Sequence, residues 1–505
     1  MYCLFDELLL KKEWDVYLEA KERHSDKKID IYKSFVNRYG YRSYIRLYRA
    51  NLLKQLPIPV RKKVAKGKGR IVYSFGDNFN FFLGMVANKM TKRYDELFAP
   101  NLFSYRRFVG VKEALLTILK KKDLHCLYVY KVDISKYFYS IDIGTLFDSS
   151  LNEDLSDPEL YEFLKSLFID KKVRRYIKSK KAVIEFDEEK GVMAGTPVSG
   201  FLANYYLKDM DWDFYNNKID YIRYADDIVV FAKTRRELDE HIDRIKKWVQ
   251  VKKLKINGEK EFIYSPSDVI DFLGVEIGYN SKTDNKVVRV RRSKIEKTIS
   301  DMRKDAKFFF SKGLNRWKDY RKSKYGIEAV ADFLIGCGEL DKARSMGLLD
   351  EGDNPVKVNK ITYLIEHGFD FTGGFIRKYE TKFFGGVDEF GDLGELDNIQ
   401  RERSWRSWYF PIINTNDGFK EIDECYMDCI RYIYRRVLGC KWKKNKHGSL
   451  LHNNVQIHSL VVEYRKYVNY KKKKKDDDTA GSGVVERRRA HEVTHMGKNR
   501  CDARS

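Results

Sequence analysis

The chain has 505 residues, which is too long for one compact core and predicts two to four structural units. It carries 98 lysines and arginines against 74 aspartates and glutamates, and the net charge of +24 predicts a polyanionic partner, with nucleic acid as the first candidate. No apolar run reaches transmembrane length, which argues against a membrane protein. The seven scattered cysteines are an odd number, which favours a reducing cytoplasm over a disulfide framework.

The N-terminal part of the chain is predicted to be helical and basic. Aromatic side chains recur near helical spacing within residues 1–60, and Pro57 and Pro59 end that pattern. A basic loop and strand are expected over residues 62–73, followed by an apolar helix over residues 78–98.

The next segment joins a predicted strand to an aromatic pair. Residues 128–135 are predicted to form a strand that contains Asp133, and Phe138 follows five residues after that aspartate. Two-metal phosphoryl transfer needs carboxylates that bridge two ions about 3.5–4 Å apart, and Asp133 is a candidate for that task. The alternative is an exposed aspartate at the end of a strand, with Phe138 as a core aromatic.

A glycine-containing loop runs into a helix in the middle of the chain. A helix is expected over residues 160–177, and a loop followed by a helix over residues 193–207. Gly195 would allow another group to approach the backbone closely. Ser199 would cap the helix, a role that needs no function beyond the fold.

Tyr224-Ala225-Asp226-Asp227 lies between two predicted strands, residues 219–224 and 228–232. Two adjacent carboxylates at the reversal of a hairpin direct oxygen atoms at one place, which suits hard divalent cations such as Mg²⁺. The alternative is a solvated turn, because aspartate is a favoured turn residue.

Downstream, an amphipathic helix is expected over residues 236–254, with strands around Phe262 and across residues 272–277. The pattern becomes helical and basic after Arg292. The cluster of Trp405, Trp408, Tyr409 and Phe410 is expected in the core.

Cys425 and Cys429 lie one helical turn apart in an apolar-aromatic run, so core packing is expected of them rather than zinc binding. Residues 471–505 begin with a lysine run and continue with aspartate, glycine and serine, which predicts a disordered basic tail.

Six segments, taken in chain order, resemble the sequence motifs of reverse transcriptases. They are the fingers segment at residues 66–72, motif A at 131–142, motif B at 191–204, motif C at 224–227, motif D at 254–260 and motif E at 272–275. Residues 103–106 resemble a further block of the family. The ordered series covers roughly residues 60–280, and the order of the motifs makes the resemblance far more specific than any one of them.

The resemblance implies an α+β fold with a right-hand polymerase architecture of fingers, palm with an antiparallel sheet, and thumb, plus a mainly helical C-terminal region. The implied boundaries are an N-terminal helical extension (1–60), fingers (61–130), palm with interleaved fingers segments (131–280), helical thumb (281–345), C-terminal helical region (346–470) and tail (471–505).

The resemblance also implies roles for individual residues. The metal set would be Asp133, Ile134, Asp226 and Asp227, holding two Mg²⁺ ions, with Mn²⁺ as an alternative. Lys260 would protonate the departing pyrophosphate.

The substrate-binding set would be Lys68, Arg70, Phe138, Gly195, Ser199 and Tyr224. Lys68 and Arg70 would grip the triphosphate, Phe138 would block a ribose 2′-hydroxyl, and Gly195 would approach the template base pair. The sequence departs from the family at Met193-Ala194, where Pro-Gln is usual, and this puts ordinary template use in doubt.

The contexts of motifs A and C resemble bacterial reverse transcriptases of the group II intron and retron kind. No His-Asn-His endonuclease signature or RNase H carboxylate set is evident in the sequence. The basic N-terminal extension and the unfamiliar C-terminal region resemble defence-associated reverse transcriptases, which implies antiphage defence with a companion non-coding RNA.

The partners expected are an RNA template, a dedicated non-coding RNA, a DNA product and dNTPs. The protein is expected in the cytoplasm and not at a membrane, and a homo-oligomer is a possible state of assembly. Three alternatives remain: a template-independent nucleotidyl transferase, a mobile-element reverse transcriptase, and an idle RNA-binding scaffold, against which the intact aspartates argue.

Overall fold

The computed structural model describes residues 3–23, 28–63, 69–180, 187–322, 327–346, 348–349, 351–354, 373–385, 404–438 and 459–472. The chain divides into two compact units, one formed by residues 1–288 with 392–402 and the other by 289–391 with 403–505. No helix within the described part of the chain is long and apolar enough to cross a membrane.

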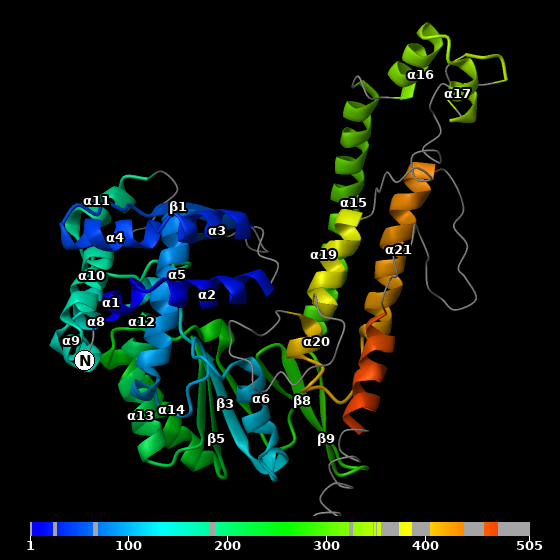
Figure 1. The fold of residues 1–505 in the computed structure, drawn as a ribbon. Coiled ribbons are helices and arrows are strands. Elements are labelled where there is room, and N and C mark those ends of the chain that lie inside the picture. Colours follow the sequence, from blue (N-terminus) through cyan, green and yellow to red (C-terminus); the bar gives the residue numbers. More distant parts are fainter. Residues whose placement is uncertain are drawn as a thin grey trace, which may run out of the picture. The chain divides into compact units, whose positions relative to one another are not determined.

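The first unit begins with four helices, in the N-terminal part that the sequence predicted to be helical. They are α1 (Leu4–Leu8), α2 (Lys11–Arg23), α3 (Ile29–Asn37) and α4 (Gly40–Arg49). They lie beside the long helix α5 (Asp77–Arg93) (Figure 1). Aromatic side chains pack between them and α5. The indole of Trp14 is fully buried, stacks on Tyr41 and Phe82, and donates its N–H to the Leu8 carbonyl at 2.7 Å. The N-terminal extension therefore shares one core with the helix that follows it.

A two-stranded antiparallel hairpin, β1 (Ile58–Lys63) and β2 (Gly69–Ser74), separates these helices from α5. Pro57 and Pro59 end the helical pattern as expected, but Pro59 lies inside β1, opposite Tyr73. Each strand of a two-stranded sheet has a free edge, and a proline on such an edge costs no ladder hydrogen bond.

Short helices follow: η1 (Asp95–Leu97), α6 (Val111–Leu119), η2 (Leu124–Cys126), α7 (Tyr137–Ser140), α8 (Ile143–Leu146), α9 (Ser149–Leu155), α10 (Pro158–Phe168) and α11 (Lys171–Lys178). The single helix expected over residues 160–177 is wrong, because α10 and α11 are separate. The carboxylate of Asp170 accepts the Lys172 amide at 2.6 Å and so starts a new helix at that point.

The central sheet has four antiparallel strands in the order β4 (Tyr221–Tyr224), β5 (Asp227–Ala232), β3 (Tyr128–Asp133) and β6 (Phe262–Tyr264). Helix α14 (Arg235–Val251) packs on β3 and β5 through Leu238, Ile242, Ile245 and Val249, and α13 (Lys208–Asn216) packs on β4 (Figure 1). Helix α12 (Ser199–Tyr206) precedes α13, and η3 (Gly258–Lys260) precedes β6. The expected mixed fold with antiparallel sheets is confirmed.

A second sheet contains β7 (Ile270–Phe272), β8 (Val275–Asn280) and β9 (Asn285–Val290). Leu273 and Gly274 connect β7 to β8 with φ values of +47° and +87°. Two successive residues with positive φ are typical of a tight hairpin turn, so the strand expected across residues 272–277 is wrong: a turn at Leu273 and Gly274 interrupts it.

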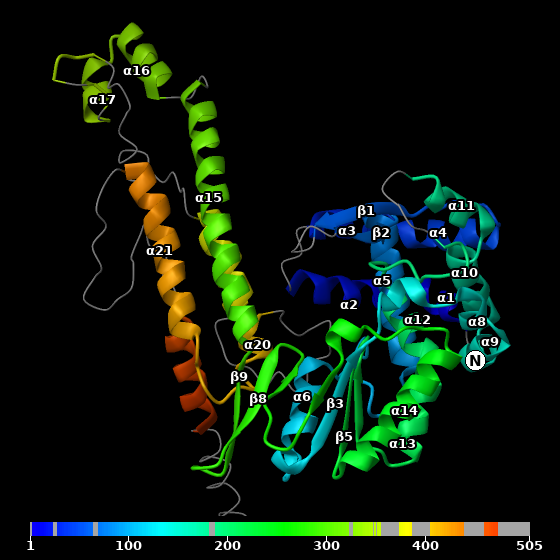
Figure 2. The same cartoon turned by 180° about the vertical axis from the view of Figure 1, so that it is seen from behind.

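The second unit is helical. It contains α15 (Arg292–Lys322), α16 (Ile327–Gly336), α17 (Leu340–Ser345), α19 (Gly373–Phe384), α20 (Trp405–Trp408), α21 (Phe419–Leu438) and a helix over residues 460–472. Helices α15 and α21 run side by side (Figure 2).

The core of this second unit is rich in aromatic side chains. Trp405, Tyr409 and Phe410 are buried as expected, whereas Trp408 is 41% exposed. Cys425 and Cys429 are buried in this core, which confirms their expected packing. Residues 471 and 472 of the expected disordered tail still belong to a helix, and residues 473–505 lie outside the described residues.

Candidate active site

The strand register brings the three predicted aspartates together at one end of the central sheet. Asp133, the last residue of β3, lies opposite Asp227, the first residue of β5, and Tyr224 of β4 pairs with Asp227 from the other side. The amide of Ile134 donates to the carbonyl of Asp226 at 3.1 Å, so the end of β3 is tied to the turn between β4 and β5.

The carboxylates at this end of the sheet repel one another in a poorly hydrated place. Burial, followed by the charges of Asp226 and Asp133, raises the pKa of Asp227 to about 6. Burial and the charge of Asp133 also raise the pKa of Asp226. A nearby cation would relieve both effects, because it favours the ionised forms.

Such a cation is already present on Asp133. Lys260 donates from Nζ to Asp133 Oδ2 at 2.7 Å, and Asn257 donates from Nδ2 to Asp133 Oδ1 at 3.2 Å. Burial opposes the charged amine, but the hydrogen bond to Asp133 and the charges of Asp133, Asp227 and Asp226 together raise the pKa of Lys260. The amine therefore stays protonated at neutral pH.

The side chains present fit a divalent ion by their chemistry. Among the residues that the structure describes, no three His, Cys, Asp or Glu side chains are arranged so that they could hold a metal ion. The donor set is nevertheless made of carboxylate oxygens, which Mg²⁺ prefers, and a bound cation would oppose the burial and repulsion that raise the pKa values of Asp226 and Asp227. Ile134 is fully buried beside them and could contribute only a backbone oxygen.

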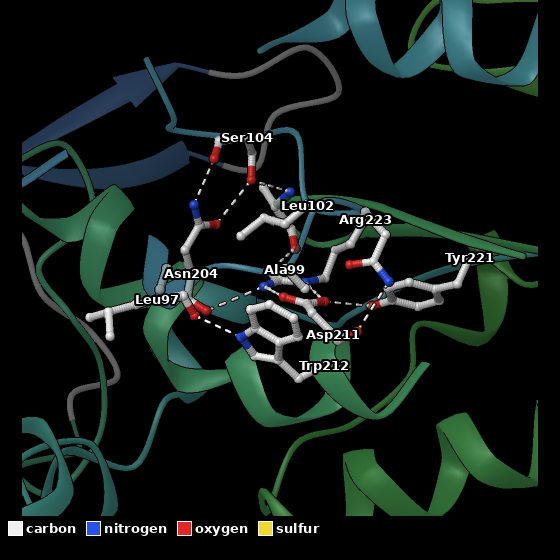
Figure 3. Close-up of polar contacts among 12 residues, drawn as sticks. Leu97, Ala99, Leu102, Ser104, Asn204, Asp211, Trp212, Tyr221 and Arg223 are labelled. Atoms are coloured by element: carbon white, nitrogen blue, oxygen red, sulfur yellow. Dashed lines mark hydrogen bonds and ion pairs between the residues drawn. The ribbon is translucent and has the colours of Figure 1, made fainter. Parts of the chain in front are cut away.

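A buried polar network lies directly behind the turn and was missed by the sequence analysis (Figure 3). Arg223 and Asp211 form an ion pair in which both side chains are 0% exposed, with Nε of Arg223 2.8 Å from Asp211 Oδ1. The Tyr221 hydroxyl also donates to Asp211 Oδ1, at 3.0 Å. Burial opposes the guanidinium, but the charge of Asp211 outweighs it and raises the pKa of Arg223, so the pair is ionised. The available signal was that charged residues lie within two otherwise apolar segments, residues 210–214 and 219–224.

The network fixes Ala225, the residue at the centre of the turn. Ala225 has a φ of +59°, in the left-handed region that is unfavourable for a residue with a Cβ atom. Arg223 Nη1 donates to the Ala225 carbonyl at 3.1 Å, and the Ala225 amide donates to Ser104 Oγ at 2.8 Å. Both backbone groups of Ala225 are therefore bound by buried side chains, which offsets the conformational cost.

Ser104 and Asn204 connect this turn to two other parts of the chain (Figure 3). Ser104 Oγ donates to Asn204 Oδ1 at 3.0 Å, and Asn204 Nδ2 donates to the Ser104 carbonyl at 2.6 Å. Arg223 Nη2 donates to the Asn204 carbonyl at 3.2 Å. Residues 103–106 and helix α12, two of the segments that resemble family blocks, thus meet the Tyr-Ala-Asp-Asp turn in one network.

The loop before α12 lies against the β1–β2 hairpin. Gly195 has a φ of +100°, and a Cβ atom there would lie 3.0 Å from Val72 Cβ and 3.3 Å from the Tyr73 carbonyl oxygen. The Tyr73 amide donates to the Ala194 carbonyl at 2.8 Å. Gly195 therefore does allow a close approach, to strand β2.

Ser199 does not cap α12, so that expectation is wrong. Its hydroxyl donates to the Met193 carbonyl at 2.9 Å and is hydrogen-bonded to Thr196 Oγ1. The residue before it, Val198, already has helical backbone angles, so Ser199 lies inside the first turn. Its buried hydroxyl holds the loop to the helix.

Of the other predicted substrate residues, Tyr224 pairs with Asp227, and Lys68 is outside the described residues. Arg70 is exposed on β2, and its charge acts on Asp226. Phe138 is half-buried on α7, and Tyr224 is half-buried at the end of β4.

Residues 79–277 match the family model described as reverse transcriptase (RNA-dependent DNA polymerase). The chain therefore carries a reverse transcriptase domain that includes Asp133, Asp226, Asp227 and Lys260. Its helices and antiparallel sheets have the right-hand polymerase architecture typical of such domains.

Several solved polymerase structures are similar to parts of this chain, at low sequence identity and with low TM-scores. Apo telomerase from Candida tropicalis truncated from its C-terminal domain is 14% identical over 49% of this chain and 59% of its own, less than two thirds of its length, with a TM-score of 0.34. Apo telomerase from Candida tropicalis is 12% identical over 80% of this chain and 72% of its own, with a TM-score of 0.35. The RNA-dependent RNA polymerase from bacteriophage phi12 is 15% identical over 49% of this chain and 41% of its own, with a TM-score of 0.30. No curated protein matches the sequence.

Proposed function

We propose that this protein is an RNA-directed DNA polymerase that makes cDNA by two-metal phosphoryl transfer. The observation that carries the proposal is the meeting of Asp133, Asp226 and Asp227 at the end of the central sheet, within the segment that matches the reverse transcriptase family. Burial, followed by the charges of Asp226 and Asp133, raises the pKa of Asp227 to about 6, and a divalent cation bound there would stabilise its ionised form.

In this proposal Asp133, Asp226, Asp227 and the backbone of Ile134 hold two Mg²⁺ ions, with Mn²⁺ as an alternative. The ions supply Lewis acidity for attack by a primer hydroxyl and for departure of pyrophosphate. Lys260 is protonated at neutral pH and donates its proton to the leaving pyrophosphate.

The substrate residues select and orient the nucleotide. Arg70, with Lys68 next to β2 in the sequence, binds the triphosphate through charge-assisted hydrogen bonds. Phe138 excludes a ribose 2′-hydroxyl, and Tyr224 lines the same nucleotide-binding site. Gly195 and Ser199 keep the loop before α12 close to the template base pair.

Primer extension tests the proposal. The purified protein should extend a DNA primer on an RNA template with dNTPs and Mg²⁺. The double substitution Asp226→Asn with Asp227→Asn should lower the rate by several orders of magnitude, because the metal clamp supplies most of the catalysis. Asp243→Asn, on the exposed side of α14, is the matched control and should have no effect. Near-normal synthesis by the double variant contradicts the assignment.

A template-independent nucleotidyl transferase is the second candidate, and Ala194 favours it. In the family a glutamine at this place helps to position template and nucleotide, and alanine has no side-chain polar group to replace it. Omission of the RNA template separates the two functions, because a transferase would continue to extend the primer and a templated polymerase would stop.

We further propose a role in bacterial antiphage defence, in the cytoplasm, with a companion non-coding RNA. Support comes from the basic helical N-terminal extension and from the helical second unit, which lies beyond the matched residues. A mobile-element reverse transcriptase, of the intron or retron kind, is the competing role.

Cells that carry the gene with its native flanking DNA should resist some phages, and Asp227→Ala should abolish the resistance. New insertion copies in a retrohoming assay, without a phage phenotype, would favour mobility. Sequencing of the nucleic acid that co-purifies with the protein would identify the template, and light scattering would give the oligomeric state.

A further inference from the structure

Tyr105 has a strained backbone that the buried network fixes in place. Its φ is +50°, which is uncommon for a bulky residue and persists only where neighbouring contacts determine it. The peptide group before it belongs to Ser104, whose carbonyl accepts from Asn204 Nδ2 and whose hydroxyl accepts from the Ala225 amide (Figure 3). The same contacts that hold the aspartate turn therefore also hold the start of Tyr105.

The ring of Tyr105 rests directly on the backbone of α12 at Gly200. A Cβ atom at Gly200 would lie 2.6 Å from both Cγ and Cδ1 of Tyr105 and 3.1 Å from its Cβ. Such distances are forbidden, so only glycine at this position allows the ring to lie there. One side of the ring is thus set against a helix, while the residue as a whole is 45% exposed.

The edge of this ring meets Phe138. The two ring centroids are 6.0 Å apart at an interplanar angle of 81°, which is a favourable edge-to-face pair. Tyr137, its neighbour in the chain, contacts Phe138 in the same manner, at 6.0 Å and 76°, and is itself fixed by a hydrogen bond from its hydroxyl to the Ala203 carbonyl. Phe138 therefore contacts two tyrosines that are both anchored on α12.

Tyr105 also lies among the charged groups of the site. Burial, followed by the charges of Tyr224 and Asp226, raises the pKa of Tyr105 to about 12, and the charge of Arg70 opposes this rise. The hydroxyl is neutral at physiological pH, so the side chain acts through its shape. Its surroundings are the residues to which the proposed function assigns catalysis and triphosphate binding.

We propose that Tyr105 is a positioning residue for sugar selection: seated on Gly200, it fixes the ring of Phe138 against the 2′ position of an incoming nucleotide. The inference rests on the proposed polymerase function and adds a determinant of its specificity. Loss of the Tyr105 ring would leave Tyr137 as the one tyrosine of this pair in contact with Phe138, whose ring would be freer to turn away from a ribose.

Single-nucleotide incorporation with dNTPs and rNTPs tests this role, with the ratio of the two efficiencies as the readout. Phe138→Ala should lower discrimination against rNTPs strongly, and Tyr105→Ala should lower it by a factor of about 3 to 10, as expected for one edge-to-face pair. dNTP incorporation should change much less, and Tyr105→Phe should match the wild type. Tyr215→Ala, which removes a tyrosine of similar exposure on α13, should leave the ratio unchanged.

The double variant shows whether Tyr105 acts through Phe138. In the Phe138→Ala background, Tyr105→Ala should add no further loss of discrimination. Gly200→Ala should displace the Tyr105 ring and reproduce the effect of Tyr105→Ala. If Tyr105→Ala does not fold, Tyr105→Leu makes the same comparison, because it keeps apolar bulk over Gly200 without an aromatic edge.

An unchanged ratio in a folded Tyr105 variant, or additive losses in the double variant, overturns the inference while the polymerase function stands. A wild-type protein that incorporates neither kind of nucleotide overturns the proposed function, and this inference with it.

Discussion

Lys260 and Asp133 form a hydrogen-bonded ion pair of 2.7 Å between residues that are 127 positions apart in the chain. The Asp133 side chain is 6% exposed and that of Lys260 is 56% exposed, so the amine covers the solvent side of a buried carboxylate. In the free protein the proposed proton donor is therefore held by one of the proposed metal ligands.

Lys260→Gln is expected to lower the rate of nucleotide addition by about 10²-fold or more, the usual contribution of a general acid. Lys260→Arg should keep the pairing with Asp133 but restore little of the rate, because a guanidinium is a poor proton donor. The pKa of Lys260 is raised in the metal-free protein, and the loss of rate that its deprotonation would cause at alkaline pH should be absent in Lys260→Gln. A pH–rate profile measures both effects, with Lys246→Gln on α14 as the control. Full activity in Lys260→Gln would show that Lys260 is not the proton donor.

Asp227→Asn is expected to stabilise the metal-free protein at neutral pH. The pKa of Asp227 is raised to about 6, above its unfolded value, so its contribution to stability is complete below the unfolded pKa and is lost as the pH rises through about 6. At neutral pH the ionised carboxylate should oppose folding by on the order of 1–3 kcal/mol. Urea unfolding in EDTA should show Asp227→Asn as more stable at pH 7.5, with a smaller difference at pH 4.5.

Addition of Mg²⁺ extends this measurement. The ion should raise the melting temperature of the wild type, because a ligand that binds only the folded state stabilises it, and should do so much less in Asp227→Asn. The Asp243→Asn variant should respond as the wild type does. Equal responses of Asp227→Asn and the wild type would show that Mg²⁺ binds elsewhere.

Removing one partner of the Arg223–Asp211 pair is expected to lower the free energy of unfolding strongly. Asp211→Asn leaves a buried guanidinium without its counter-charge and should destabilise the protein by about 3–5 kcal/mol. Replacing both partners, with Asp211→Leu and Arg223→Met, should recover much of that stability, since apolar replacements of buried pairs are often neutral.

Primer extension by the same double variant should remain low, because the Ala225 carbonyl has lost its donor at 3.1 Å. Full recovery of activity together with stability would show that the pair supports the fold but does not position the turn.

RNA binding should weaken steeply with salt. A net charge of +24 implies many neutralised phosphates, and six to ten such contacts would lower affinity by about 10³–10⁵ between 50 and 200 mM salt. Fluorescence anisotropy with a labelled RNA over that range gives the slope directly. A slope near zero would contradict an extensive electrostatic interface.

The sequence predicted the parts of this site that depend on local patterns. Asp133 ends a strand of buried residues and Asp226 lies in a turn between two others, so alternation and turn chemistry were enough to place them. The network of Ser104, Asn204 and Arg223 could not be predicted in this way, because its partners are up to 121 positions apart and meet only through tertiary packing.

Two errors have the same origin. Ser199 follows a loop whose carbonyl at Met193 lies within reach of its hydroxyl, so the side chain bonds backward instead of capping the helix. Asp170 interrupts an apolar periodicity that continues across it, and only its capping bond to Lys172 shows that a new helix begins. In both cases the choice among competing hydrogen bonds depends on geometry that the residue type does not determine.

The hydrogen bond of 2.8 Å from the Tyr73 amide to the Ala194 carbonyl has a mechanical consequence. With Gly195 seated against Val72, strand β2 and the loop before α12 cannot slide past each other without breaking this contact. A ligand that shifts Arg70 on the strand must therefore carry the loop with it, and a ligand that shifts the loop must move the strand. A ligand bound at Arg70 would then change the affinity of the loop for its own ligand, and a ligand bound at the loop would change the affinity at Arg70 by the same factor. The two binding sites would therefore be thermodynamically coupled.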